Sequence, residues 1–322
     1  MSVAASPSPA LARAERIPRV SVGLPVYNGQ DYLRECLESL LAQDYRDFEL
    51  IISDNGSTDA TEEICRKYAQ QDARIRYLRE PTNRGGSWNF SRLPQLARGE
   101  YFRWSCHDDT CDPAHLRTCV EALDRAAPSV ILVLTGTAFI DEHGAVLRRV
   151  EEQLDTRGMP PHARYAHVSR RIRYSNALFG LFRREPLLAT RLHAAYANSD
   201  YVLFGELALL GEFQELPGHL FHRRMHGQMS RKANTTQEQV AVWFDTSLAG
   251  RRFYFPELSM IRDQLGAVRR APIGRLEKLR SLPVIPRVWI RRRRRCSSGS
   301  SGTTAPTSSC CAASCVFSVP TF

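Results

Sequence analysis

Short β-prone runs alternate with helical patterns over the first third of the chain, and this alternation restricts the fold more than any other feature. The β-prone runs cover residues 20–24, 48–53, 74–79 and 101–105. Between the first two, Leu33, Leu37 and Leu40 recur at helical spacing. Strands joined through helices by short connections predict an α/β fold, with a mainly parallel central sheet that helices flank.

Polar turns follow three of these runs, at residues 25–29, 54–59 and 106–109. Ligands of parallel sheets bind beyond the carboxyl ends of the strands, so we expect the three turns to meet in one cleft. The third turn contains two adjacent carboxylates, Asp108 and Asp109. A site for a hard divalent cation is the simplest use for such a pair, although loop carboxylates that only face solvent are common.

The second half of the chain continues with strands and one marked helix. Residues 130–135 predict a strand, and residues 138–147 predict a hairpin around an Asp-Glu-His-Gly turn. Asn198, Ser199 and Asp200 then precede a helix with Leu203 and Leu207 on its inner face. From this position alone, Ser199 or Asp200 is expected to cap the helix.

Composition indicates a folded, non-membrane chain whose basic charge is local. The chain has 322 residues, 43% of them hydrophobic, and a formal net charge of +10. Residues 251–295 hold 14 Lys or Arg and three acids, so the remainder is close to neutral. The cleft region therefore does not indicate nucleic acid as the main ligand. The basic segment favours a polyanionic surface, with a merely solvated charge run as the alternative.

The cysteines and the apolar runs point to a cytoplasmic protein. The nine cysteines show no paired spacing typical of zinc sites or disulfides. No apolar run approaches the ~20 residues that span a bilayer, and residues 1–18 lack the apolar core of a signal peptide. We expect residues 1–16 to form a flexible arm and residues 296–322, which carry no charge, to form a disordered tail.

Five stretches in order resemble the family 2 inverting glycosyltransferases, which have the GT-A fold. They are VSVGLPVYN at 20–28, SDNGSTD at 53–59, NRGG at 83–86, GEYF at 99–102 and HDD at 107–109. The resemblance extends over residues 17 to 231. It implies a GT-A catalytic domain at 17–235, with a nucleotide-sugar half at 17–112 and an acceptor half at 113–235, followed by a helical basic extension at 236–295.

The resemblance also implies roles for individual residues. The residues that match the nucleotide-sugar pocket of the family are Pro25, Tyr27, Asn28, Asp54, Asn83, Trp88, Asn89 and Asp108. Asp54 matches an acid that accepts a hydrogen bond from the base, and an ionised carboxylate selects a ring N–H such as that of uracil or thymine. For Pro25 to Asn28 an ordinary turn is the alternative, and for Trp88 a place in the core.

The same resemblance implies a metal site and a general base. Asp109 matches the carboxylate that holds Mg²⁺ or Mn²⁺ on the donor diphosphate, and His226 is a second candidate ligand, with a structural role as its alternative. Many family members carry an acid where Cys106 stands, which puts the metal geometry in doubt. Asp200 matches the base that deprotonates the acceptor hydroxyl.

The sequence thus predicts an inverting glycosyltransferase that uses a nucleotide-diphosphate sugar, with UDP or TDP favoured, in polysaccharide or glycolipid biosynthesis. The partners expected are that donor, a saccharide or lipid-linked acceptor, and an anionic membrane reached through residues 284–295 at the inner face. A catalytically silent module of the same fold is one alternative. A nucleotidyltransferase is another, although no Gly-rich phosphate loop with a Lys follows the first strand.

Overall fold

The computed structural model describes residues 17–229, 234–250 and 256–286. Its first half is a parallel sheet whose strands pair in the order β3-β2-β1-β4. The elements of this half are β1 (Val20–Val26), α2 (Leu33–Leu41), β2 (Phe48–Asp54), α3 (Thr61–Gln71), β3 (Ile75–Arg79), α4 (Gly86–Leu96) and β4 (Tyr101–Trp104). The predicted alternation of strands and helices is confirmed here.

The second half extends the same sheet with both orientations. Its elements are β5 (Thr110–Cys111), α5 (His115–Arg125), β6 (Val130–Ile140), β7 (Val146–Val150), α6 (Pro161–Arg171), η1 (Asn176–Phe179), β8 (Leu181–Arg183), α7 (Arg184–Leu188), α8 (Ser199–Leu210) and β9 (Glu212–Arg224). Strand β8 lies antiparallel between β4 and β6, and β9 is parallel to β6. The whole sheet is therefore mixed, and its parallel part is formed by β1 to β4.

One sequence-based detail changes in the second half. The predicted strand at 130–135 continues to Ile140, so β6 itself forms the first arm of the hairpin with β7. Strand β9 lies between β6 and the two-residue strand β5.

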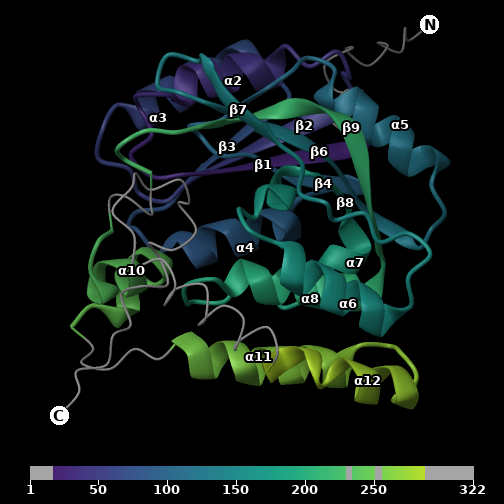
Figure 1. The fold of residues 1–322 in the computed structure, drawn as a ribbon. Helices are drawn as coiled ribbons and strands as arrows, with labels where there is room; N and C mark the ends of the chain where they lie inside the picture. The colour runs from purple at the N-terminus through teal and green to yellow at the C-terminus, as the bar shows by residue number, and fades with distance from the viewer. Residues whose placement is uncertain (1–16, 230–233, 251–255, 287–322) are drawn as a thin grey trace, which may run out of the picture.

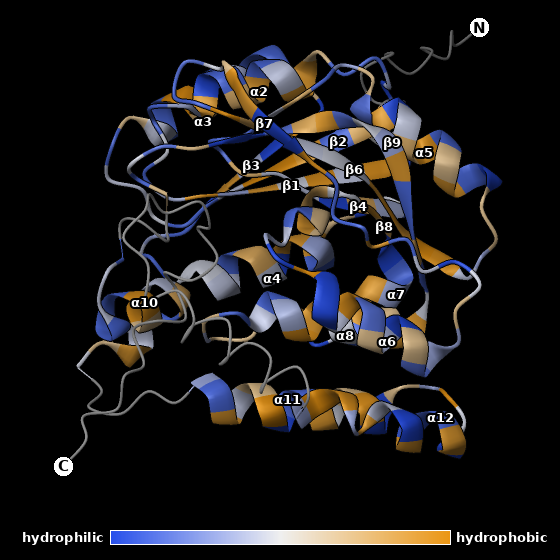
Figure 2. Cartoon of the chain, viewed as in Figure 1, coloured by the Kyte–Doolittle hydropathy of each residue, from blue (hydrophilic) through white to orange (hydrophobic). Residues whose placement is uncertain are grey.

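Alternation along the central strands divides the core into two layers. In β2, Leu50 and Ile52 pack toward α2 and α3, whereas Ile51 faces α4 and α8 on the other side. In β4, Phe102 and Trp104 join Ile51. Because helices cover both faces of these strands, the strands are mainly apolar (Figures 1 and 2), with Glu49 and Arg103 as buried exceptions.

The basic extension packs on the outside of α4, α6 and α8 as a further layer (Figure 1). Its elements are α10 (Gln237–Phe244), η2 (Thr246–Leu248), α11 (Pro256–Arg270) and α12 (Arg275–Ser281). Ala267, Val268 and Ile285 form one buried cluster with Tyr165 of α6 and Leu209 of α8. The extension therefore shares a core with α6 and α8.

This packing corrects part of the membrane prediction. Ile285 is 4% exposed and Val284 packs against the same cluster, so neither side chain is free to enter a membrane. The rest of the predicted membrane segment, residues 287–295, lies outside the described residues. Among the helices that the structure describes, none combines the length and the apolar composition needed to cross a bilayer.

Candidate active site

The three polar turns meet beyond the carboxyl ends of β1, β2 and β4. The Asn28 N–H donates to Ser57 Oγ at 3.0 Å, and Asn28 Oδ1 accepts from the Thr58 N–H at 2.8 Å. Gly29 lies against the third turn, since a Cβ at this position would stand 2.7 Å from the ring of His107. The predicted convergence of the turns is confirmed, and Gly29 is required by the close approach.

The first turn presents one aromatic side chain at the surface. Pro25 is buried within β1, where it pairs in register with Ser53 of β2. Tyr27, two residues further on, is 42% exposed, and Asn28 adopts a left-handed conformation with φ of 51°. Asn tolerates this conformation better than most residues. The turn therefore holds Tyr27 at the surface as a platform on which a flat ring can stack.

Asp54 lies beneath the second turn and has no exposed surface. One carboxylate oxygen accepts from the Ser57 N–H at 2.8 Å and the other from the Tyr77 hydroxyl at 2.7 Å. Burial and this hydrogen bond raise the pKa of Tyr77, so its hydroxyl remains a donor. In this geometry Asp54 holds the turn together, and its contact with a base stays a prediction.

Asn83 and Asn89 tie α4 and the loop before it to the strand ends. Asn89 Nδ2 donates to the Ser53 carbonyl at 2.9 Å, and its Oδ1 accepts from Ser53 Oγ. Asn83 Oδ1 accepts from Asn55 Nδ2 at 2.9 Å and from the Gly85 N–H at 2.8 Å. Both side chains form hydrogen bonds within the protein, so they shape the cleft by fixing its backbone.

Trp88 is covered by two arginines. The guanidinium carbons of Arg84 and Arg92 lie 3.9 and 4.5 Å from the centroid of its ring. These are cation–π contacts. The Trp88 side chain is partly buried. Its ring therefore supports the guanidinium groups of Arg84 and Arg92 at the cleft margin.

The carboxylate pair lies at the end of β4 and faces the last residues of β9. Asp109 Oδ1 accepts from the Arg224 N–H at 2.9 Å, and Asp108 Oδ2 lies 3.0 Å from His226 Nε2. An ionised carboxylate only accepts, so Nε2 is the donor in this pair. The fold thus brings together two acids and a histidine that are more than a hundred residues apart in the sequence.

The two carboxyl groups have opposite pKa shifts. Burial acts most strongly on both and raises each pKa. For Asp108 the charge of His107 and the hydrogen bond to His226 outweigh burial and lower the pKa to about 2. For Asp109 burial and the neighbouring charge of Asp108 raise the pKa well above its usual value. Such a pair of neighbouring acids is stabilised when a cation binds between them.

The residues present fit a hard divalent cation. Ligand atoms of Cys106, Asp108 and Asp109 all lie within 4.8 Å of one another. Burial raises the pKa of the Cys106 thiol well above 9.0, so this group is a neutral, soft donor. Mg²⁺ and Mn²⁺ prefer carboxylate oxygens, which leaves Asp108 and Asp109 as the suitable ligands. His226 Nδ1 is buried without a hydrogen-bond partner among the described residues, and a direct role of His226 as a ligand stays a prediction.

Arg224 organises this site, a role that sequence reasoning missed. Arg224 is 1% exposed, donates from Nε to the Asp108 carbonyl at 3.1 Å and pairs with Glu35 of α2 at 2.6 Å. Its position at the end of β9 predicted no such burial. The arginine therefore fixes the backbone of the acidic turn.

Asp200 stands in the first turn of α8. Its charge acts on His193, whose pKa burial lowers to about 4. The His193 ring contacts Trp104 at the end of β4, with ring centroids 5.5 Å apart. The loop before α8 is held by Ser91 of α4, whose hydroxyl donates to the His193 carbonyl at 3.0 Å. Asp200 is thereby linked to the strand that leads into Asp108 and Asp109.

Comparison with known proteins agrees with this geometry. Residues 21–187 match the family model described as glycosyl transferase family 2. An uncharacterised glycosyltransferase of Rickettsia typhi is 30% identical over 195 residues, which are 61% of this chain and 54% of the relative. The chain thus spans about half the length of that relative.

Two solved structures share the fold at low sequence identity. S. aureus TarS in complex with UDP-GlcNAc has a TM-score of 0.63 and 17% identity, over 88% of this chain and 76% of that one. The mannosyltransferase PcManGT from Pyrobaculum calidifontis, in complex with GDP-Man and Mn²⁺, has a TM-score of 0.51 and 17% identity, over 90% and 77% of the two chains. Both likenesses establish a shared curled sheet with flanking helices.

Proposed function

We propose that this chain, which belongs to glycosyl transferase family 2, moves a sugar from a nucleotide-diphosphate sugar to an acceptor hydroxyl with inversion at the anomeric carbon. The observation that carries the proposal is the convergence of three polar turns on the adjacent acids Asp108 and Asp109, of which Asp109 is buried. A cleft at the carboxyl ends of parallel strands is where α/β folds bind nucleotides.

The donor is proposed to lie along the first and second turns. Tyr27 offers its exposed ring to the base, and Asn28 lies beside it. UDP and TDP are favoured because uracil and thymine carry a ring N–H that a carboxylate such as Asp54 can accept. Since Asp54 is buried, reading of the base by this residue requires the 54–59 turn to shift. The related structures hold UDP-GlcNAc in one case and GDP-Man in another, so they favour no single base.

A divalent cation, Mg²⁺ or Mn²⁺, is proposed at Asp108 and Asp109. When bound there, it would neutralise the negative charge that develops on the departing nucleoside diphosphate. The chain's own contribution is to hold the two carboxylates in place, through the Arg224 N–H on Asp109 and His226 on Asp108. The complex of PcManGT with Mn²⁺ supports a metal of this kind.

Asp200 is proposed as the general base. It takes the proton of the acceptor hydroxyl while that oxygen attacks the anomeric carbon from the face opposite the diphosphate. The bond from the anomeric carbon to the phosphate oxygen breaks, and the configuration inverts. A place in polysaccharide or glycolipid biosynthesis at the cytoplasmic face of a membrane is part of the same proposal.

The decisive experiment is donor binding and hydrolysis by the purified protein. UDP-, TDP-, GDP- and CMP-sugars are titrated with and without Mn²⁺, comparing the wild type with Asp109→Asn and Asp200→Asn. We expect metal-dependent binding of a UDP- or TDP-sugar, which Asp109→Asn weakens by about ten-fold or more. Asp200→Asn is expected to retain donor binding and to lower turnover by about a hundred-fold or more.

The matched control is Glu121→Gln, which removes an exposed acid from the far helix α5. It should bind and hydrolyse the donor like the wild type. Failure of every nucleotide sugar to bind at any Mn²⁺ concentration would contradict the proposed function.

A further inference from the structure

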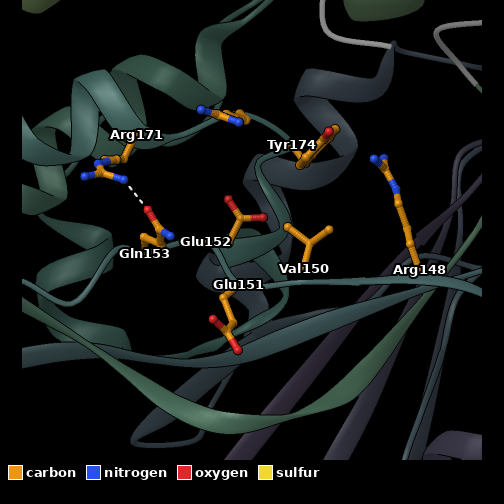
Figure 3. A pocket seen from close by; sticks show the side chains of 8 residues that line it. Arg148, Val150, Glu151, Glu152, Gln153, Arg171 and Tyr174 are labelled. Atoms are coloured by element: carbon orange, nitrogen blue, oxygen red, sulfur yellow. Dashed lines mark hydrogen bonds between the residues drawn. The ribbon is translucent and has the colours of Figure 1, made fainter. Parts of the chain in front are cut away.

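A pocket outside the cleft just described opens between the β7 hairpin and the segment that follows α6. Its volume is about 300 Å³, near the lower end of the range that holds small ligands. The lining residues are Arg148, Val150, Glu151, Glu152, Gln153, Arg171, Arg173 and Tyr174. In the view of Figure 3, Arg148 and Arg171 lie on either side of Glu152.

Three arginines make the lining of the pocket positively charged. The Arg148 guanidinium lies over the rings of Phe139 and Tyr174, at 4.4 and 5.2 Å from their centroids. Arg171 donates from Nη1 to Gln153 Oε1. A guanidinium carries more N–H donors than either contact uses, and its planar fork suits carboxylate and phosphate oxygens. Donors for an anion therefore remain at the wall of the pocket.

The acids of the pocket do not cancel this charge. Glu152 is 6% exposed and accepts a hydrogen bond from Asn176 Nδ2 at 2.9 Å. Burial and the nearby Glu215 raise its pKa to about 7, against the opposing effects of Arg223, Asn176 and Arg173. A substantial fraction of Glu152 is thus neutral near pH 7. Glu151, which is exposed, contributes one negative charge, so the three arginines outnumber the ionised acids of the lining.

Hydrogen bonds connect the pocket to both sides of the proposed catalytic cleft. Arg223 Nη1 donates to the Tyr174 carbonyl at 2.7 Å and to Asn176 Oδ1 at 2.5 Å. The next residue, Arg224, donates its N–H to Asp109. On the other side, the hydroxyl of Tyr201, the neighbour of Asp200 on α8, donates to the Arg173 carbonyl at 3.1 Å. The pocket wall is therefore bonded to the strand behind the metal site and to the helix of the proposed base.

We propose that this pocket binds an anionic group, a carboxylate or a phosphate, of the acceptor saccharide. This proposal rests on the proposed function, because only a transferase would make the bound saccharide an acceptor. Arg148, Arg171 and Arg173 hold the anion through charge-assisted hydrogen bonds. The Tyr174 ring, which already supports Arg148, offers an apolar face to the sugar. Because the backbone of Arg173 at the pocket wall is bonded to Tyr201, the neighbour of Asp200, the proposal has the acceptor extend from here toward the proposed base.

The test measures binding of three related sugars by ligand-observed NMR titration. The probes are glucuronate, glucose 6-phosphate and neutral glucose, each with and without UDP and Mn²⁺. The proteins are the full chain as wild type, the double variant Arg148→Gln/Arg171→Gln, and Arg170→Gln as the matched control. Arg170 is the exposed neighbour of Arg171 and bonds only to the Ala166 carbonyl of its own helix among the contacts described. Circular dichroism and the thermal midpoint verify that the variants are folded.

We expect at least one anionic sugar to bind about ten-fold or more tightly than glucose, since one charge-assisted contact accounts for such a factor. The double variant should lose this preference and Arg170→Gln should keep it. Preference for glucuronate identifies a carboxylate as the group, and preference for glucose 6-phosphate identifies a phosphate.

Equal affinity for the three sugars, including no detectable binding of any, overturns the proposal, as does a preference that survives in the double variant. UDP binding separates this outcome from failure of the proposed function. A wild type that binds UDP with Mn²⁺ but shows no anionic preference contradicts only the pocket. A wild type that shows the Arg-dependent preference but never binds UDP contradicts only the transferase.

Discussion

Glu152 is a buried acid whose surroundings make its charge costly. It is 6% exposed, and Glu215 of β9 adds a second carboxylate nearby. Asn176 Nδ2 and the charges of Arg223 and Arg173 offset only part of this, so the pKa rises from 4.5 to about 7. In the folded state Glu152 therefore holds its proton more tightly than in the unfolded chain. The free energy of unfolding then falls as the pH rises from about 4.5 to about 7.

Glu152→Gln should remove this dependence. Gln keeps an oxygen that accepts from Asn176 but cannot ionise. We expect the variant to match the wild type near pH 4.5 and to be more stable by up to about 3 kcal/mol above pH 7. Urea unfolding at pH 5 and pH 8 measures the difference, with the exposed neighbour variant Glu151→Gln as control. An equal stability change at both pH values would contradict the assigned pKa.

Single residues of the candidate site were predictable to different degrees. Asp108 and Asp109 were identified because adjacent acids after a strand have few structural uses, and the fold places them at the cleft. Asp54 and Asn89 were identified only through the family resemblance, and their side chains bond inside the protein. Arg224 was missed in its actual role, because nothing in its local sequence distinguishes a buried guanidinium from an exposed one.

Helix α11 is proposed to position the base through the loop that precedes α8. Its Asp263 is 2% exposed and accepts from Arg191 at 2.6 Å and from the Tyr196 hydroxyl at 2.9 Å. These two residues bracket the loop that contains His193 and leads into α8. The basic extension thus holds the loop that leads into α8.

Asp263→Asn should loosen this loop. One amide oxygen cannot serve both donors as the carboxylate does, and the amide nitrogen would face a donor. We expect a loss of about 1–3 kcal/mol in the free energy of unfolding, together with a lower kcat and little change in donor affinity. Denaturant unfolding and donor hydrolysis measure the two effects. Glu257→Gln on the same helix is the control, and a donor affinity that falls as much as kcat would contradict the positioning role.

At the scale of the whole molecule, the outer layer exposes leucines among arginines. On α11, Leu258, Arg262, Leu265 and Arg269 are exposed at helical spacing, and on α12 Leu276 is 58% and Leu279 63% exposed (Figure 2). Positive charge beside apolar side chains is complementary to an anionic lipid surface. We therefore propose that the membrane contact expected for residues 284–295 uses this face of α11 and α12.

The paired change Leu276→Ser/Leu279→Ser should weaken binding to anionic vesicles by about ten-fold, because it removes apolar surface that would enter the lipid. Flotation with phosphatidylglycerol vesicles measures this, and phosphatidylcholine vesicles test the charge requirement. Leu147→Ser, at an exposed leucine next to Arg148 on β7, is the matched control. A wild type that floats with neither lipid would contradict the membrane contact, and one that floats equally with both would contradict its requirement for anionic lipid.

Local sequence patterns predict the α/β order of the first half, the three polar turns and the acids that follow β4. These are local properties, since strand and helix periods and turn residues are written within a few neighbouring positions. Three features become visible only in the folded protein. Strand β8 runs antiparallel within the sheet, and Ile285 packs against α6 and α8. Arg224 and His226 face Asp109 and Asp108. Each of these features depends on contacts between residues far apart in the chain. The free energy of such contacts cannot be inferred from a few neighbouring residues.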